Sequence, residues 1–357
     1  MLPKEPILAA MLVAALVCLA PGCRKAPPSS RDASSDRAQT DHPADAAGNA
    51  GTPPALHVGA PPTDDEEGAS TPSPALAEGE QSPRSQLLAV LSEQATQAFL
   101  AGERALADGD CESAAASFAR AVRLHPDNVA LLQTLSEALV AAGHHDRAID
   151  TYERILVLDE HDLDTMYNLA VAYTRLEDYH QAEQTYRRLL RIDERHLRAR
   201  FNLAGVYRAQ GKLEAARGAW LACVQQDDSH AEAHALLGEV LLQLQQPEAA
   251  LPYLRRASAL APDDLATHLH LAAAAKLTGS YGWAATALKR ATQLAPDNAE
   301  VWADLGGVLL TIHRNAGRRK FLDEAIAAWE RSLEIDPDQP ALREYLATYR
   351  PGDRSTN

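Results

Sequence analysis

One short phrase recurs along this chain at a fixed interval. It reads LAPDN at residues 294–298, with close variants at Leu124 (LHPDN), Leu260 (LAPDD) and Ile335 (IDPDQ). Leu124 and Leu260 are 136 residues apart, which is four times 34, and Leu260 and residue 294 are 34 apart. The last interval is 41, or 34 plus about two turns of helix. A period of 34 residues indicates one small structural unit stacked several times, because such a unit cannot bury its apolar face alone.

Setting each phrase proline at position 32 gives seven units that abut without a gap. They start at Ala95, Val129, Leu163, Leu197, Ala231, Leu265 and Ala299. Each unit has apolar residues at helical spacing, which predicts two amphipathic helices, here called A and B.

Three positions of the unit predict how helices A and B pack. Position 20 is alanine throughout, and a small side chain there would let two helices approach closely: Ala114, Ala148, Ala182, Ala216, Ala250, Ala284 and Ala325. Position 24 is large and is expected to fill the space between successive units: Phe118, Tyr152, Tyr186, Trp220, Leu254, Leu288 and Trp329. Position 7 is leucine from the second unit onward and is expected to pack helix A on helix B: Leu135, Leu169, Leu203, Leu237, Leu271 and Leu305.

Turn residues predict where the helices end. Gly109, Gly143, Gly211 and Gly279 share position 15, where a left-handed residue ends helix A. The phrase proline stops helix B, since the residue before a proline is pushed out of the helical region, and the Asp or Asn that follows caps the next helix A. Units two to four have an acidic residue instead of that proline, so we expect a softer boundary there.

These columns resemble the tetratricopeptide repeat family, whose pattern has Leu at 7, Gly or Ala at 8, Tyr at 11, Ala at 20, an aromatic residue at 24, Ala at 27 and Pro at 32. The similarity covers residues 95–339, and YNLAVAY, FNLAGVY and KFLDEAIAAWERSLEIDP are its strongest stretches. It implies an all-α fold, a right-handed superhelical solenoid of about seven helix-turn-helix units with a concave groove. Residues 85–339 would form this domain, and residues 340–357 a cap helix and tail.

The N-terminus has the layout of a secretory signal. Lys4, an apolar run over residues 7–20 and Pro21-Gly22-Cys23 follow one another, and the run is short for a bilayer span. This end resembles a bacterial lipobox, which implies a signal peptide over residues 1–22 and lipid attachment at Cys23. Arg24 after the cysteine favours the outer membrane, facing the periplasm. An ordinary cleaved signal with an incidental cysteine is the alternative.

Residues 23–84 are rich in Pro, Ser, Ala, Gly and Asp. So few large apolar residues cannot offset the entropy cost of ordering, which predicts a disordered tether. A glycosylated stalk remains an alternative.

Bulk properties exclude several classes of function. The net charge of −15 argues against nucleic acid as a partner. Cys111 and Cys223 fall three repeats apart, too far for a disulfide, and no zinc-like spacing exists. No catalytic motif is present, and His230 with His234 lacks a third ligand. We therefore expect no enzyme activity, no cofactor and no metal.

The groove is the better candidate for a functional site. In the family, positions 2, 5, 6, 9, 12 and 13 of helix A face it. Asn168 and Asn202 stand at position 6, where O-linked N-acetylglucosamine transferases carry an asparagine ladder that holds an extended peptide; here the ladder breaks at Leu236. The candidate peptide-binding residues are Tyr167, Asn168, Arg175, Arg198, Phe201, Asn202, Arg208 and His270. The asparagines would hold a backbone and the arginines carboxylates; a merely solvated face is the alternative.

A second surface feature is the insertion in the last unit. HRNAGRRK, residues 313–320, is expected to place a basic patch in a long turn between helices A and B: Arg314, Arg318, Arg319 and Lys320. It either solvates that turn or contacts an acidic partner.

The sequence thus predicts a lipid-anchored scaffold of the bacterial cell envelope that binds other proteins. Its layout resembles the pilotins that assist secretins and the repeat subunits of polysaccharide-export and envelope-assembly machines. The alternatives are an accessory arm of a polysaccharide-export or glycosyltransferase system, and a homo-oligomeric structural protein. Little chain remains after the repeats for a catalytic domain.

Overall fold

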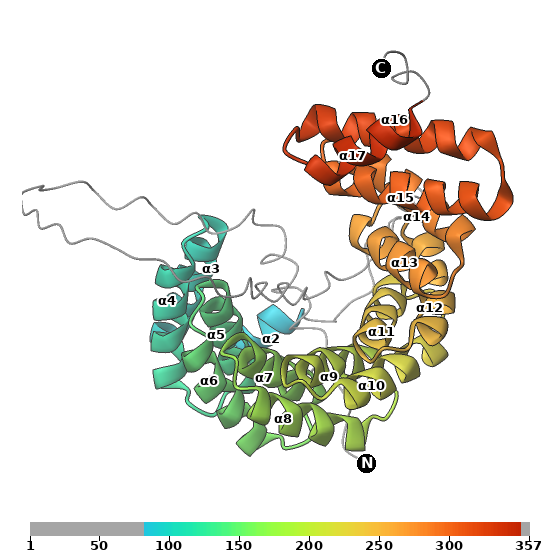
Figure 1. Ribbon diagram of the computed structural model, residues 1–357. Helices are drawn as coiled ribbons and strands as arrows, with labels where there is room; N and C mark the ends of the chain where they lie inside the picture. The colour runs from blue at the N-terminus through green and yellow to red at the C-terminus, as the bar shows by residue number, and fades with distance from the viewer. Residues whose placement is uncertain (1–81, 351–357) are drawn as a thin grey trace, which may run out of the picture. The chain divides into compact units, whose positions relative to one another are not determined.

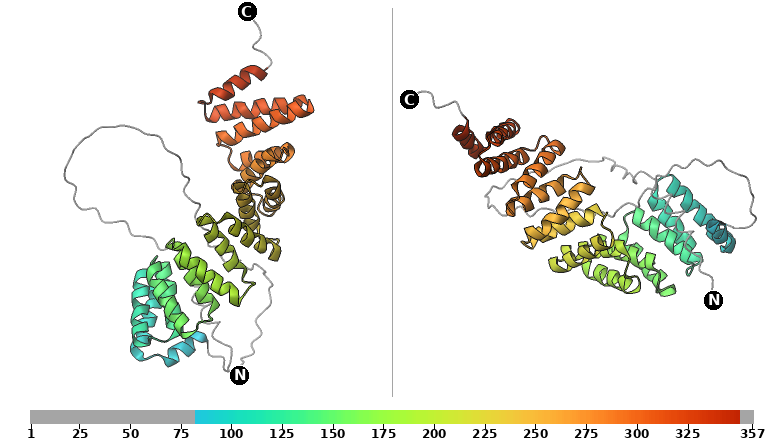
Figure 2. Two further views of the ribbon diagram at one scale, coloured as in Figure 1. Left: turned by 60° about the horizontal axis from the view of Figure 1, so that its bottom comes forward. Right: turned by 90° about the vertical axis from the view of Figure 1, so that its right-hand side faces the viewer.

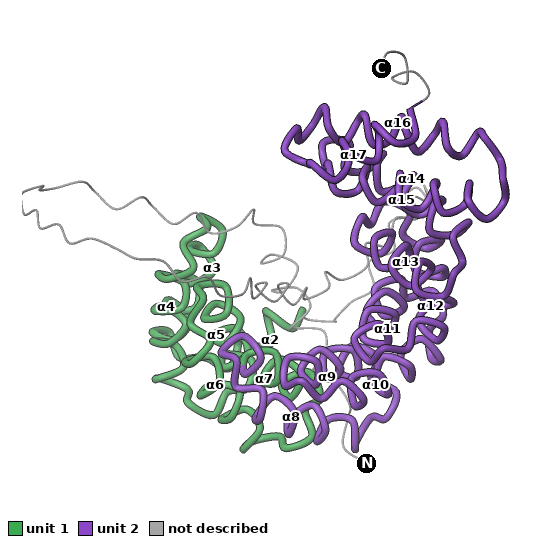
Figure 3. The backbone as a smooth tube through the Cα atoms, in the orientation of Figure 1, with its two compact units in different colours: residues 1–172 green, residues 173–357 purple. Residues whose placement is uncertain are grey.

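A computed structural model describes residues 82–350, and within this range all regular structure is helical (Figure 1). The sixteen described helices, α2 to α17, include seven consecutive A and B pairs, α3 and α4 through α15 and α16. The predicted all-α solenoid of helix pairs is confirmed. By internal contacts the chain divides into two compact units, Met1–Ala172 (unit 1) and Tyr173–Asn357 (unit 2), coloured separately in Figure 3.

Unit 1 holds the first helix pairs. Its helices are α2 (Pro83–Val90), α3 (Glu93–Ala107), α4 (Cys111–Leu124), α5 (Val129–Ala141), α6 (His145–Leu158) and most of α7 (Leu163–Arg175). Helix α3 begins two residues before the repeat register places it, because Ser92 is its N-cap and accepts a hydrogen bond from the Ala95 N–H.

Unit 2 continues the same alternation. Its helices are α8 (Tyr179–Ile192), α9 (Leu197–Ala209), α10 (Leu213–Gln226), α11 (Ala231–Gln243), α12 (Pro247–Leu260), α13 (Leu265–Leu277), α14 (Tyr281–Leu294), α15 (Ala299–Ala316), α16 (Arg319–Ile335) and α17 (Pro340–Tyr349). Both views of Figure 2 show consecutive helix pairs of a unit lying side by side.

The three predicted packing columns form the core. Every alanine at position 20 is fully buried, and the side chains at positions 7 and 24 are buried in every repeat for which they were predicted. In the first, fifth and seventh repeats the position 24 side chain lies directly on a glycine at position 8 of its own repeat, as Trp329 does on Gly306. It also reaches the next repeat, since Asn202 donates to the hydroxyl of Tyr186. Position 24 therefore packs within its own repeat as well as between repeats.

The repeat boundaries without proline are as sharp as those with it, so the expected softening is wrong. Helices α6, α8 and α10 all end at position 30, as the others do, and are followed by Asp159, Asp193 and Asp227 in an extended conformation. Each of these carboxylates accepts a hydrogen bond from the backbone N–H two residues later. This Asx turn ends the helix in place of the proline.

The four glycines at position 15 have positive φ, as predicted. Two non-glycine residues at the same position, Glu177 and Gln245, adopt it as well, each with φ of 60°. The turn geometry is therefore set by the packing of the two helices, and glycine merely lowers its cost.

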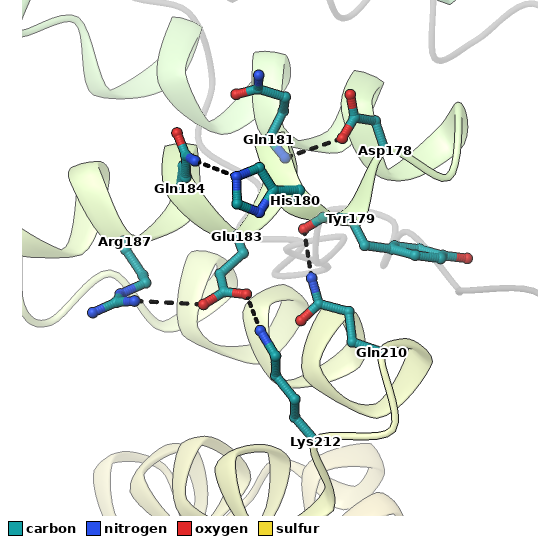
Figure 4. A network of polar contacts seen from close by, with 9 residues as sticks. All are labelled: Asp178, Tyr179, His180, Gln181, Glu183, Gln184, Arg187, Gln210 and Lys212. Carbon is teal, nitrogen blue, oxygen red and sulfur yellow. Dashed lines mark hydrogen bonds and ion pairs between the residues drawn. The ribbon is translucent and has the colours of Figure 1, made fainter.

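A polar network joins the third repeat to the fourth within unit 2 (Figure 4). The Glu183 carboxylate accepts from Lys212 Nζ at 2.7 Å and pairs with Arg187 at 3.4 Å, and the hydrogen bond from Lys212 is the main reason that the Glu183 pKa is lowered. Gln210 Nε2 donates to the Tyr179 carbonyl at 2.9 Å. These contacts fix the A–B turn of one repeat on helix B of the preceding one.

The last repeat corrects one prediction. The seven-residue insertion does not form a long turn, because α15 runs to Ala316 and α16 begins at Arg319. Gly317, with φ of 65°, ends α15, and only Gly317 and Arg318 connect the helices. The insertion thus lengthens both helices: Arg314 lies in the last turn of α15, Arg319 and Lys320 in the first turn of α16, and Arg318 in the connection.

The predicted signal peptide, Cys23 and nearly all of the predicted tether lie outside the described residues. The exception is residues 82–84, where Pro83 and Arg84 begin α2 and Arg84 binds the Glu103 carboxylate at 2.7 and 2.8 Å. Among the described helices, none is long and apolar enough to cross a membrane.

Candidate functional site

The candidate site is the face formed by positions 2, 5, 6, 9, 12 and 13 of the A helices, here called the A face. The predicted residues divide between the units, with Tyr167 and Asn168 in unit 1 and the others in unit 2. Asn168, Arg175 and Arg198 are exposed, while Phe201, Asn202, Arg208 and His270 are half-buried. Tyr167 is 8% exposed, so its ring belongs mainly to the core.

Phe201 and Asn202, on α9, are held by neighbouring rings. The Phe201 ring stacks on His230 at 4.9 Å between centroids and meets Trp220 edge-on at 6.4 Å. The Asn202 amide nitrogen donates to the Tyr186 hydroxyl at 3.3 Å. Because Tyr186 and Trp220 are fixed in the core, both side chains are preorganised on the A face.

Arg208 is already engaged by a carboxylate of the next A helix. Its Nη1 lies 3.0 and 3.1 Å from the two carboxylate oxygens of Glu239, and its guanidinium lies over the Trp220 ring at 5.5 Å. The predicted use of Arg208 for a partner's carboxylate is therefore replaced by a bond between α9 and α11. Lys276 and Asp304 form the equivalent pair between α13 and α15, at 2.6 Å.

Sequence reasoning missed these two pairs, although their signal is simple. A base at position 12 is followed, 28 to 31 residues later, by an acid at position 6 or 9 of the next repeat. Since consecutive A helices lie side by side in unit 2, with α9, α11 and α13 on one side of it in Figure 3, this spacing brings the charges together.

The A face of unit 2 also has an apolar part that the sequence analysis overlooked. Leu236, Leu242 and Leu269 are half-buried against the core, and Leu277 is 66% exposed. They follow the polar and aromatic residues of α9 along α11 and α13. The A face of unit 2 thus offers amide and aromatic groups first and aliphatic groups next, which suits an extended or helical peptide with apolar side chains.

Three histidines in or next to α11 and α13 have structural roles. The His230 ring caps α11 by accepting from the Ala233 N–H, and buried His234 and His268 contact the carbonyls of Asp228 and Pro262. Residues 82–350 contain no group of three side chains suited to a metal ion. Cys223 is a buried free thiol whose pKa is raised to about 12 by burial.

The basic residues of the last repeat are largely paired. Arg319 contacts Asp323 at 3.0 Å, Lys320 contacts Glu324 at 3.7 Å, and Arg314 donates to the Tyr349 hydroxyl. Two of the four cations are thus offset by carboxylates of α16, while Arg314 bonds a neutral hydroxyl.

Comparison with known proteins supports the repeat reading. Three sequence models of the tetratricopeptide repeat match residues 105–172, 167–229 and 231–264. None of the curated proteins compared with the chain is a significant match.

Solved structures with the same architecture include the C-terminal part of a TPR repeat-containing protein from Cytophaga hutchinsonii, at 15% identity and a TM-score of 0.56, covering 70% of this chain and 99% of that one. A tetratricopeptide repeat protein from Parabacteroides merdae aligns at 16% identity and a TM-score of 0.49, covering 72% and 99%. PilF of Pseudomonas aeruginosa aligns at 21% identity and a TM-score of 0.46, covering 63% and 98%. The three sequence models thus recognise tetratricopeptide repeats within residues 105–264.

Proposed function

We propose that this protein is a scaffold that binds peptide segments of other proteins along the A face of its repeats. Tetratricopeptide repeats generally mediate contacts between proteins. The observation that carries the proposal is the row of half-buried and exposed A-face side chains on α9, α11 and α13, from Asn202 to Leu277, that the core does not fully cover. Such preformed surfaces bind at little conformational cost.

The chemistry of the A face suggests how a segment is held. The amide of Asn168 in unit 1 and the amide of Asn202 in unit 2 are each suited to a peptide backbone, because an amide both donates and accepts. The leucines of α11 and α13 are suited to apolar side chains. Arg175 and Arg198, both exposed, are suited to carboxylates of the segment. Arg208 instead pairs with Glu239 and so joins α9 to α11.

The proposal is tested by selecting binding peptides from a random library with the full chain. The affinity of a selected peptide is then measured for the wild type and for the Asn168→Ala, Asn202→Ala variant. Two lost amide contacts of about 0.5 to 1.5 kcal/mol each, or about 1 to 3 kcal/mol together, predict a loss of affinity of roughly 5- to 140-fold. Gln184→Ala, which truncates an exposed amide side chain on α8, is the matched control and should leave affinity unchanged. Equal affinities for wild type and double variant would refute the assignment.

We also propose that this scaffold works in the bacterial cell envelope, anchored at Cys23 in the outer membrane and facing the periplasm. The support is the lipobox-like signal in the sequence. Labelling with a lipid analogue should be lost in Cys23→Ala, and an unlabelled wild type would contradict the anchor.

A further inference from the structure

The first repeat has an open face. In later repeats the equivalent face is covered by the preceding repeat. A hollow of about 650 Å³ lies in unit 1 between one side of α3 and the end of α4. It is lined by Gln94, Gln97, Ala98, Ala101, Arg120, Arg123 and Leu124. All of these residues are exposed except buried Ala98, so the hollow is open to solvent.

Equivalent surfaces in later repeats show what this face is built to contact. Arg154, Arg256 and Arg290, at position 26, each donate to the carbonyl at position 32 of the preceding repeat, at 2.7, 3.3 and 3.1 Å. Arg120 is the position 26 residue of the first repeat. The register places Ser92 at the preceding position 32, but among residues 82–350 the Arg120 guanidinium makes no hydrogen bond like those of its counterparts.

A second position explains why the face is hollow. His234, His268 and Trp302, at position 4, fill the junction with the preceding repeat and contact the same position 32 carbonyl, at 3.0 to 3.1 Å. The first repeat has Ala98 there. The missing ring leaves a space that is suited to an added segment of chain.

The positive charge of the residues that line the hollow indicates which kind of ligand would bind there. Neither Arg120 nor Arg123 pairs with a carboxylate of the described chain, and Gln94 and Gln97 add amide groups beside them. Two neighbouring guanidinium groups and two amides favour a segment that offers both backbone carbonyls and carboxylates. An extended acidic peptide fits this description.

An acidic segment of this kind lies shortly before α2 in the sequence. Residues 64–67 read DDEE, the longest acidic run of the sequence, and lie outside the described residues. Fifteen residues separate Glu67 from Pro83, enough to span up to about 50 Å when extended. Arg84 at the start of α2 is bound to Glu103 on the A face of α3, so the run must pass around α3 to reach the hollow, which this length allows. The run is thereby tethered at an effective concentration on the order of millimolar.

We propose that the acidic run Asp64–Asp65–Glu66–Glu67 binds in the hollow of the first repeat, against Arg120 and Arg123, and covers the open end of the repeat stack. This contact would close the face to other ligands and to a second copy of the chain. It is independent of peptide binding on the A face, because none of the residues that line the hollow stands at an A-face position.

Zero-length carbodiimide crosslinking of the full chain tests the contact. Carbodiimide joins carboxylates to lysine but not to arginine, so the double variant Arg120→Lys, Arg123→Lys keeps the charge and adds two reactive amines. Mass spectrometry is expected to find an intramolecular link between residues 64–67 and position 120 or 123. Neutralising the run (Asp64→Asn, Asp65→Asn, Glu66→Gln, Glu67→Gln) should reduce this link at least fivefold, as should 0.5 M salt, since screening shortens the Debye length to roughly 4 Å.

Arg147→Lys, at an exposed position of α6, is the matched control for chance encounters of the tethered run. Equal linkage at position 147, or no linkage at positions 120 and 123 in a folded variant, would overturn the proposal. Linkage found only in covalent dimers would overturn it in favour of a second copy as the occupant. Hydrogen exchange of residues 94–101 in the unsubstituted chain gives an independent readout, and exchange that is no faster after the run is neutralised would also contradict it.

Discussion

Adjacent glycines of α15 give a matched test of the packing between position 8 and position 24. A Cβ atom at Gly306 would lie 2.3 Å from Trp329 Nε1 and 2.4 Å from its Cδ1, whereas a Cβ at Gly307 would meet no atom within 4 Å. Both residues are helical, so Gly→Ala has the same effect on the unfolded chain and on helix propensity, a gain of about 1 kcal/mol. The two substitutions therefore differ only in the contact with Trp329.

The cost at Gly306 follows from that contact. Trp329 is 2% exposed and donates to the Ala303 carbonyl at 3.2 Å, so the ring cannot move aside freely. Overpacking and the weakened hydrogen bond together cost about 2 to 3 kcal/mol. Ala204 opposite Trp220 in the fourth repeat shows that a helix pair can be built with a methyl group there, which places the cost at the lower end. Gly306→Ala is expected to destabilise the protein by about 1 to 2 kcal/mol and Gly307→Ala to stabilise it by about 1 kcal/mol.

Urea unfolding of the full chain, followed by circular dichroism and tryptophan fluorescence, measures both effects. Midpoints are compared, since repeat arrays need not unfold in two states. Adding Trp329→Leu to Gly306→Ala recreates the Ala272 and Leu288 pair of the sixth repeat and should recover part of the loss. Equal midpoints for the two single variants would refute the reasoning, because the contact with Trp329 would then carry no energy.

Two further predictions concern buried ionisable groups. Burial raises the pKa of Glu137 on α5 to about 7, and its Oε2 has no hydrogen-bond partner in the described chain. Between about pH 4.5 and 7 the unfolded chain loses this proton while the folded protein keeps it, so stability should fall as pH rises through that window, by at most about 3 kcal/mol. Glu137→Gln should flatten this dependence in urea unfolding at pH 5 and pH 8, and an unchanged slope would contradict the assignment. Cys223, with its pKa raised to about 12, should resist a thiol reagent at pH 8 until urea unfolds the chain, as mass spectrometry of the modified site would show; rapid native labelling would mean that α10 opens.

The sequence by itself determined the repeat and its core. A 34-residue period with alanine at position 20 and a large residue at position 24 constrains both helices, because each small or large side chain must meet its counterpart in every copy. Helix starts from Val129 to Ala299 coincide with the repeat register for that reason. The resemblance also led correctly to the tetratricopeptide repeat between residues 105 and 264.

The tertiary structure alone decided which polar groups remain available. Arg208 looked free in the sequence, yet it is bound by Glu239 of the next A helix. Arg120, which no motif distinguished, faces an open hollow. Ion pairs between repeats depend on how closely neighbouring helices stack and in what register, and a side chain's partner lies about 30 residues away in the chain. Hydrophobic periodicity is a property of each helix, so sequence records it; the pairing of charges is a property of the space between helices.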